Sequence, residues 1–146
     1  MKFDLIIDKN SIESVVATVH QKSELTDKIE DLVLKYNGED KLLAYNENDM
    51  MWLTFPEIEC ITIIDGKTYA ITRSGEKLRI RQRLYEIETV LPSYFIRINK
   101  SSLANEKFLV RFSTTFSGAV DAIFESGYKE YVSRRCFAEI KRRLTK

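Results

Sequence analysis

The chain of 146 residues contains few of the residue types on which catalytic and metal sites are built. His20 is its one histidine, so a Ser-His-Asp or Cys-His site would depend on a residue that ends an apolar, β-branched stretch. Cys60 and Cys136 lie far apart and in no CxxC motif, which favours reduced packing residues over a zinc site or a disulfide framework. The five glycines stand singly, so there is no P-loop and no dinucleotide fingerprint. We therefore expect a protein that is not an enzyme, has no small-molecule substrate and needs no cofactor or metal.

Long apolar runs are also missing. No stretch approaches the roughly 20 apolar residues that cross a bilayer. The first ten residues, MKFDLIIDKN, lack the basic and apolar regions of a secretory signal. We expect a cytoplasmic protein on these grounds.

Neither acidic nor basic residues are in large excess over the whole chain, but the two kinds are unevenly distributed along it. Residues 1–65 carry 6 basic and 14 acidic side chains, whereas residues 66–146 carry 17 basic and 8 acidic ones. Such an asymmetry points to a polyanionic partner for the basic part. The alternative is that the two parts complement each other within the fold.

Residues 1–45 are predicted to form a small acidic strand-strand-helix unit, a candidate dimerisation or regulatory segment. The β-branched and apolar residues at 3–7 and 14–19 suit strands, with the sequence DKNS as the turn between them. The second run could instead begin a helix, because Asn10 and Glu13 have the spacing of a capping box. Residues 23–36 are predicted as a helix, with Ser23 as its N-cap and Asn37-Gly38 as its stop. We expect its apolar stripe to pack in the core, and that stripe comprises Leu25, Ile29, Leu32, Val33 and Tyr36.

Residues 46–146 are predicted to form a mainly β domain with one short helix in the middle and one at the end. Turn signals such as Asp65-Gly66 and Ser74-Gly75 separate the apolar runs. The expected helices are 84–91, which Pro92 ends, and 135–144. The expected strands, of which the first lies just before this domain, are 41–45, 50–55, 58–64, 67–72, 77–82, 94–98, 108–112, 119–125 and 129–133.

Basic residues gather in three clusters in this second part. The sequence KLRIRQR (77–83) places a basic residue at every second position, which predicts a strand with a basic face. The sequence RINKSS (97–102) combines residue types that contact phosphates and base edges. The sequence YVSRRCF (131–137) supplies two arginines, and Lys141, Arg142 and Arg143 follow on the closing helix. Each cluster could be a solvated surface, but together they favour DNA or RNA binding.

Two stretches resemble the LytTR DNA-binding domain of bacterial transcription regulators. They are LRIRQRLYEIETVLPSYFIRINKSSLANEKFLVRF and ESGYKEYVSRRCFAEIKRRL. The family pattern is a basic strand, a short SLxELExxL-type helix, a Phe-x-Arg-x-x-x-Ser strand leading to an Asn, and a closing Gly-x-x-x-x-Val-Ser-Arg-Arg. The resemblance covers about residues 49–144, and the acidic first third is similar to the N-terminal extension of compact members that have no receiver domain.

The resemblance implies an elongated stack of small antiparallel β-sheets and a homodimer on a repeated site in double-stranded DNA. Loops, rather than a recognition helix, would enter the major groove. By position in the motif, the base-reading loops carry Lys67, Lys100 and Arg135. Residues expected to contact phosphate or to hold these loops are Arg81, Arg83, Arg97, Ser101, Ser102 and Arg134.

Two departures and one alternative accompany this interpretation. Gly118-Ala119 stands where many compact members have Gly-Arg, and the residue at Lys100 varies in chemical type within the family. Arg97 could instead be a half-buried arginine paired with a carboxylate. The alternative function is a protein-interaction module whose N-terminal unit is bound by a regulatory partner, for instance an inhibitory membrane protein.

Overall fold

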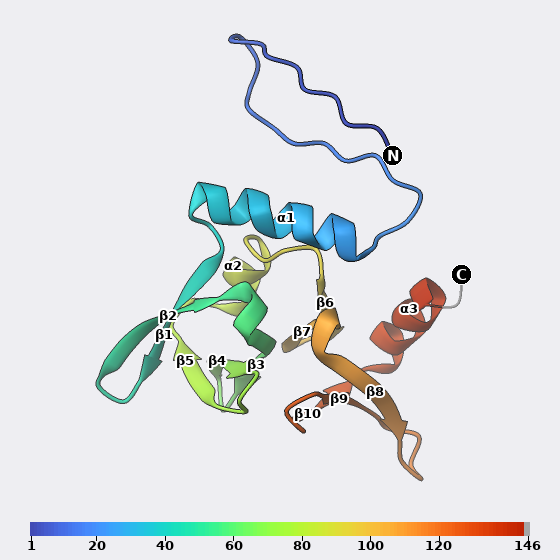
Figure 1. Cartoon of the computed structure of the whole chain (residues 1–146). Helices are drawn as coiled ribbons and strands as arrows, with labels where there is room; N and C mark the ends of the chain where they lie inside the picture. The colour runs from blue at the N-terminus through green and yellow to red at the C-terminus, as the bar shows by residue number, and fades with distance from the viewer. Residues whose placement is uncertain (145–146) are drawn as a thin grey trace.

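The computed structural model describes residues 1–144 and contains two antiparallel β-sheets and three helices (Figure 1). The prediction of a mainly β chain is confirmed. The elements are α1 (Glu24–Asn37), β1 (Lys41–Asn46), β2 (Asp49–Thr54), β3 (Ile58–Ile64), β4 (Lys67–Thr72), β5 (Lys77–Ile80), α2 (Leu84–Glu88), β6 (Phe95–Asn99), β7 (Ser102–Asn105), β8 (Leu109–Thr114), β9 (Val120–Phe124), β10 (Lys129–Val132) and α3 (Arg134–Leu144). Short 3-10 turns at Phe55–Glu57 and Glu106–Phe108 precede β3 and β8.

The larger sheet has seven strands in the order β2-β1-β5-β4-β3-β7-β6, and the smaller sheet has the order β10-β9-β8. Side chains that alternate along the central strands enter two separate cores, as strand geometry requires. Ile61 and Ala70 lie in the first core with Leu84 and Ile87 of α2. Cys60 and the other face of the sheet belong to the second core, which the small sheet and α3 complete. The large sheet is therefore covered by α2 on one face and by the small sheet and α3 on the other.

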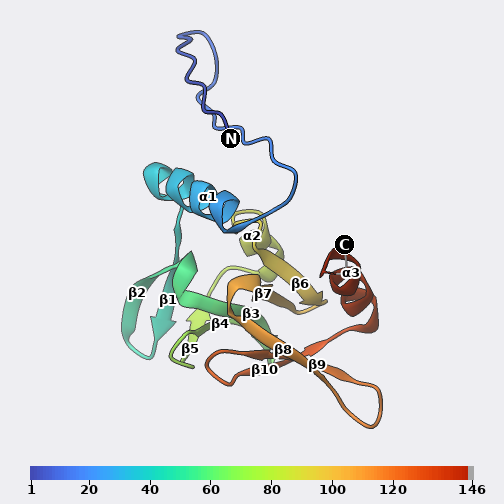
Figure 2. The ribbon, with the colours of Figure 1, turned by 45° about the vertical axis from the view of Figure 1, so that its right-hand side comes forward.

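The N-terminal unit differs from the prediction. Residues 1–22 form neither of the two expected strands, nor the alternative helix, and extend away from the sheets (Figures 1 and 2). Within one copy these apolar runs have no sheet edge or covering surface beside them, and an isolated two-stranded ribbon is marginal in water.

Helix α1 forms where it was predicted, with Ser23 before it and Gly38 in the left-handed conformation after it (φ 73°). Its apolar stripe, however, does not pack in the core: Leu25, Leu32 and Tyr36 are 45%, 69% and 87% exposed. The opposite face, which carries Glu30, Asp31 and Leu34, docks instead, and Leu34 packs against the first core.

Several element boundaries also differ from those expected. The basic strand is shorter, because β5 ends at Ile80, and the short helix α2 ends at Glu88 rather than at 91. The division of the chain at residues 45 and 46 stays a prediction, and in the structure β1 pairs with β2 and β5 of the large sheet. Residues 145 and 146 of the second predicted unit lie outside the described residues.

Candidate nucleic-acid interface

The hairpin turn between β3 and β4 carries Lys67. Asp65 and Gly66 both have positive φ (51° and 77°), which is the backbone of the type I′ turn that Asp-Gly favours. Ile64 and Lys67 are the last paired residues of the hairpin, and Lys67 is exposed. The turn therefore fixes a cation at one end of the large sheet.

The tight turn between β6 and β7 carries Lys100 and lies beside this hairpin. The side chain of Asn99 shapes the turn, since its Oδ1 accepts a hydrogen bond from the Ser101 amide at 2.7 Å. The Ile63 amide of β3 donates to the Ser101 carbonyl at 3.0 Å, which ties the turn to the end of β3. Lys100 is exposed at the tip, whereas Ser101 is half-buried.

The junction between β10 and α3 carries Arg134 and Arg135. The Ser133 amide donates to the Ile98 carbonyl at 2.9 Å, and the Ser133 hydroxyl accepts from the Cys136 amide at 3.2 Å, as an N-cap does. Asn99 donates from Nδ2 to the Tyr131 carbonyl at 2.6 Å. These bonds hold the start of α3 against the end of β6.

Both arginines are exposed in the first turn of α3, which has no acidic residue. Cations there face the positive end of the helix dipole, so the placement weakens rather than strengthens the helix. A local conflict of this kind is typical of a residue retained for binding.

A half-buried carboxylate, that of Glu130, connects the strands that carry these three loops. Glu130 of β10 accepts hydrogen bonds from the hydroxyls of Thr62 at 2.5 Å and Ser102 at 2.9 Å, and from the Tyr128 hydroxyl at 3.1 Å. Burial raises the pKa of Tyr128 well above its ordinary value and the charge of Glu130 adds to the shift, so the phenol stays protonated and can donate. The network spans β3, β7 and β10, and thus both sheets.

The structure places Ser102 in this network rather than at the surface. It is 1% exposed and its hydroxyl donates to Glu130. Of the two roles expected for it, the buried position fits holding the loop and leaves no access to a phosphate.

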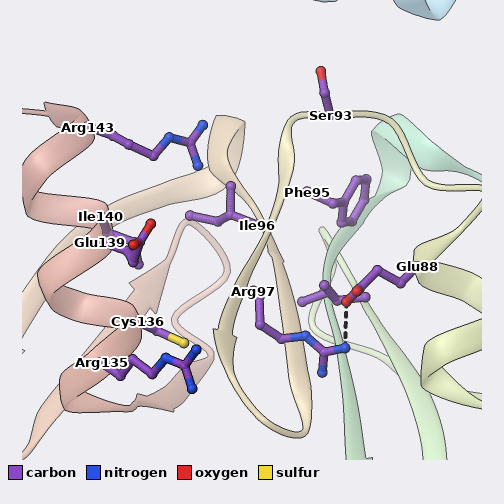
Figure 3. A pocket seen from close by; sticks show the side chains of 11 residues that line it. Glu88, Ser93, Phe95, Ile96, Arg97, Arg135, Cys136, Glu139, Ile140 and Arg143 are labelled. Atoms are coloured by element: carbon purple, nitrogen blue, oxygen red, sulfur yellow. Dashed lines mark ion pairs between the residues drawn. The ribbon is translucent and has the colours of Figure 1, made fainter.

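Arg97 is half-buried and paired with a carboxylate, as the alternative interpretation had it. Its guanidinium lies 2.5 Å from Glu88 of α2 and donates to the Lys100 carbonyl at 2.8 Å (Figure 3). It therefore supports the β6–β7 turn from behind.

Arg97 and Arg135 line opposite sides of a groove of about 430 Å³ between β6 and α3 (Figure 3). The apolar lining includes Phe95, Ile96 and Ile140, and Arg143 lies at its upper end. The groove separates the positioning arginine from the exposed one.

Arg81 and Arg83 follow β5, beyond its last paired residue. Ile80 pairs with Thr68, so Arg81 lies at the same end of the large sheet as Lys67. Its guanidinium stacks 4.1 Å from the ring centre of Tyr45, a cation–π contact. Arg83 is exposed in front of α2, where its amide donates to Glu86 at 3.1 Å.

The structure therefore brings Lys67, Lys100 and the pair Arg134–Arg135 to neighbouring loops, with Arg81 at the adjacent strand end. Sequence reasoning missed Glu130, since a lone acidic residue in a strand pattern gives no signal of a contact with β3 and β7. The amide of Asn99, noted only within its cluster, is the other residue on which the loop geometry depends.

Within residues 1–144 no group of three His, Cys, Asp or Glu side chains could hold a metal ion. Burial raises the pKa of the Cys60 thiol, with Glu130 and Glu59 adding to the shift. No helix among these residues is long and apolar enough to span a membrane.

Comparison with solved structures supports the fold assignment. A LytTr DNA-binding domain from Bacillus cereus superposes with a TM-score of 0.64 at 18% identity, covering 72% of this chain and 96% of the other. The prediction of a LytTR-like fold is thereby confirmed.

Relatives match the chain over nearly its whole length. Two proteins of Staphylococcus aureus, from strains NCTC 8325 and MW2, are named uncharacterized HTH-type transcriptional regulators and are 29% and 28% identical over 148 residues, which is 99% of each chain. In this chain, strands separate the three described helices from one another, so none of them forms a helix-turn-helix pair.

The family model of the LytTr DNA-binding domain matches residues 48–145, about two-thirds of the sequence. The motifs quoted from the sequence and the superposed fold point to the same family. The chain belongs to the LytTR DNA-binding domain family of bacterial transcription regulators.

Proposed function

We propose that this regulator binds repeated elements in double-stranded DNA as a homodimer, with Lys67, Lys100 and Arg135 reading bases from loops in the major groove. The observation that carries the proposal is the hydrogen-bonded row of the β3–β4 turn, the β6–β7 turn and the β10–α3 junction. Lys and Arg donate to the guanine O6 and N7 atoms, so cations on such loops suit base edges. In this proposal Arg134, Arg81 and Arg83 contact phosphates, and Arg97, Ser101 and Ser102 hold the loops.

Among residues 1–144, the loop cations have no carboxylate as an ion-pair partner. Lys67, Lys100, Arg134 and Arg135 make no ion pair with any other residue of the described range, in contrast to Arg97. Unpaired cations on ordered loops can meet phosphates or bases without first breaking an internal pair. The geometry therefore favours a surface preorganised for a polyanion.

The test is selection of a preferred duplex from a random library, followed by affinity measurements on single variants. Lys100→Ala and Arg135→Ala should each weaken binding to the selected duplex by about 5- to 150-fold and relax the preference at one base position. Arg134→Ala should weaken all duplexes alike and reduce the slope of log affinity against log salt by about 0.9.

Lys77→Ala is the matched control, because Lys77 is an exposed cation at the start of β5, the end of that strand opposite Arg81, and its substitution should leave the affinity unchanged. Equal affinity for all duplexes, unaffected by Lys100→Ala and Arg135→Ala, would contradict the proposal. An unchanged salt slope in Arg134→Ala would remove that residue from the phosphate contacts.

The second candidate, an interaction module held by a regulatory membrane partner, draws its support from the exposed apolar side chains of residues 1–22. Co-purification of the chain with membranes, with and without a membrane protein encoded beside it, tests that function. We propose that the protein works in the cytoplasm, and the same cell fractions test this location.

A further inference from the structure

The N-terminal arm, residues 1–22, exposes an unusual amount of apolar surface. Besides Met1, eight of its large apolar side chains are exposed, with exposed fractions from 39% at Val19 to 92% at Ile12. Monomeric soluble proteins rarely keep contiguous apolar patches larger than a few hundred Å². These eight residues are Phe3, Leu5, Ile6, Ile7, Ile12, Val15, Val16 and Val19.

Helix α1 presents a second apolar surface, here called the α1 seam: Leu25, Ile29, Leu32 and Tyr36. The intervals of four, three and four residues are those of alternating a and d positions in a coiled coil. Leu25, Leu32 and Tyr36 are exposed, and Ile29 is half-buried. A seam with this spacing is suited to a second helix of the same kind.

The seam faces away from the sheets because the acidic face of α1 is the docked one. Glu30 accepts hydrogen bonds from the amide and the hydroxyl of Ser93, both at 2.6 Å. Asp31 accepts from the Tyr94 hydroxyl at 2.6 Å and pairs with Lys107 at 3.1 Å. In both views the arm lies on the side of α1 that is away from the sheets (Figures 1 and 2).

The arm already contains the turn of a hairpin. Asp8 accepts hydrogen bonds from the Asn10 amide at 3.0 Å and from the Ser11 hydroxyl at 2.7 Å. The run after this turn is apolar on both strand faces, with Ile12 and Val16 on one and Val15 and Val19 on the other. The helix that follows could cover only one face, so the other face and both strand edges need a second layer.

We propose that the N-terminal arm and the α1 seam form the homodimer interface, with a second copy of this chain as the occupant. The two arms pair as strands and the two seams pack against them and each other. An isologous contact of this kind requires only surfaces that one chain already carries. The inference rests on the proposed function, since it names the surface on which the DNA-binding dimer forms.

The area available matches that of a stable dimer. Eleven exposed side chains, eight on the arm and three on the seam, are involved. At roughly 80 Å² of apolar surface each they supply about 900 Å² per copy, against about 800 Å² per partner in a standard interface. The alignments with the staphylococcal relatives cover 99% of both chains, so those relatives also have a segment at this position.

The interface leaves the candidate DNA surface open. In Figure 1 α1 and the arm lie at the top of the molecule, whereas the β3–β4 hairpin and β10 lie at the bottom. Two copies joined through the arm could therefore present two sets of loops to one duplex.

Sedimentation equilibrium of the full chain, without DNA and over a range of protein concentrations, tests the interface. The wild type should be a dimer, and Leu32→Glu and Val16→Glu should each raise the dimer dissociation constant at least about tenfold, because each buries a charge. Val110→Glu is the matched control, since Val110 is an equally apolar residue on β8 with 59% exposure, and it should remain dimeric.

Hydrogen exchange supplies a second measurement that does not depend on the affinity of the variants. Amides of residues 3–7 and 12–19 should be protected in the wild type and lose that protection in Leu32→Glu, while β3 keeps its protection in both. A wild type that stays monomeric at all concentrations, or a dimer that Leu32→Glu and Val16→Glu leave intact, would overturn the inference.

Failure of the interface and failure of the proposed function are distinguishable. A wild type that is monomeric but still prefers one duplex element would support the proposed function and refute the interface. A dimer that Leu32→Glu disrupts, but that binds all duplexes with equal affinity, would support the interface and refute the proposed function. If the amides of the arm are protected from hydrogen exchange only when a membrane fraction is added, the arm binds a different partner and the inference is overturned.

Discussion

Replacing Glu130 by alanine should destabilise the fold and loosen the DNA-binding loops together. Thr62 and Ser102 are 2% and 1% exposed, and both hydroxyls lie within hydrogen-bond distance of the Glu130 carboxylate. The two hydroxyls are also 2.7 Å from each other, so in Glu130→Ala one can donate to the other. The second is then left buried with its proton unpaired.

The magnitude follows from this count. An unsatisfied buried hydroxyl costs about 1–3 kcal/mol, and a lost bond to a charged acceptor contributes a similar amount. Water can replace the bonds from the Tyr131 amide, which lies at the surface, and from the hydroxyl of the half-buried Tyr128. We therefore expect the free energy of unfolding to fall by about 3 kcal/mol in Glu130→Ala. With a urea m-value of about 2 kcal/mol per M, the midpoint would fall by about 1.5 M.

Two further variants make the measurement specific. Glu130→Gln keeps an oxygen toward the hydroxyls but turns an NH₂ group toward the Tyr131 amide, so its loss should be about 1 kcal/mol. Glu125→Ala removes an exposed carboxylate 3.8 Å from Arg73 and should change stability by less than about 0.5 kcal/mol. If Glu130→Ala unfolded at the same urea concentration as Glu125→Ala, the network would not hold the two sheets together as argued.

Two other changes test how α1 is docked. Tyr94→Phe removes the hydroxyl that donates to Asp31 and keeps the buried ring. The free energy of unfolding in urea should therefore fall by about 1–2 kcal/mol, and amide hydrogen exchange along α1 should accelerate. Unchanged exchange along α1 would argue against this hydrogen bond as an anchor of the helix. Asp27 has one carboxylate oxygen without a hydrogen-bond partner among the described residues, and desolvation raises its pKa, with Lys107 and Lys22 opposing the shift. Its ionised form is therefore disfavoured in the folded state, and Asp27→Asn should be more stable than the wild type at neutral pH, with the difference shrinking as pH falls through the raised pKa; a difference that grows on acidification would contradict the assigned cause.

The β domain could be predicted from the sequence because its signals are local. Alternation of apolar residues along β3 and β4, and Asp-Gly at 65–66, define a hairpin without reference to the rest of the chain. The strands of the N-terminal arm carry a similar signal but do not form in one copy. Apolar periodicity predicts that a segment is buried, but it does not indicate whether the same chain or another molecule buries it.

The same reasoning explains the wrong prediction for the stripe of α1. Leu32 and Tyr36 lie on one helical face, and such a face is usually buried. Here Glu30 and Asp31 find strong partners in Ser93, Tyr94 and Lys107, which no local pattern indicates because those residues follow more than 60 positions later. The helix therefore docks by the side that carries these carboxylates, and Leu34 on the same side packs against the first core.

For the candidate site, the resemblance identified the loops and the structure supplied their support. Lys100 and Arg135 are separated by 35 positions and lie on loops joined through Asn99 and Ser133. Glu130 could not be singled out in advance, since its importance depends on a register between two sheets.

The basic residues concentrated in the second part of the chain have two roles, as partners of carboxylates within the fold and as cations available to DNA. Several cations of the basic part neutralise carboxylates within the fold: Lys107 pairs with Asp31, Arg97 with Glu88, and Arg143 with Glu106. Of these three pairs, Lys107–Asp31 joins the basic part to the acidic part, as that alternative expects, and the other two lie within the basic part. Lys67, Lys100 and the two arginines that open α3 are left outside such pairs with described residues, all on loops at one end of the structure. A chain with a formal charge of +1 can therefore still present unpaired cations to DNA, because several of its carboxylates are paired at the docked face of α1 and behind the loops.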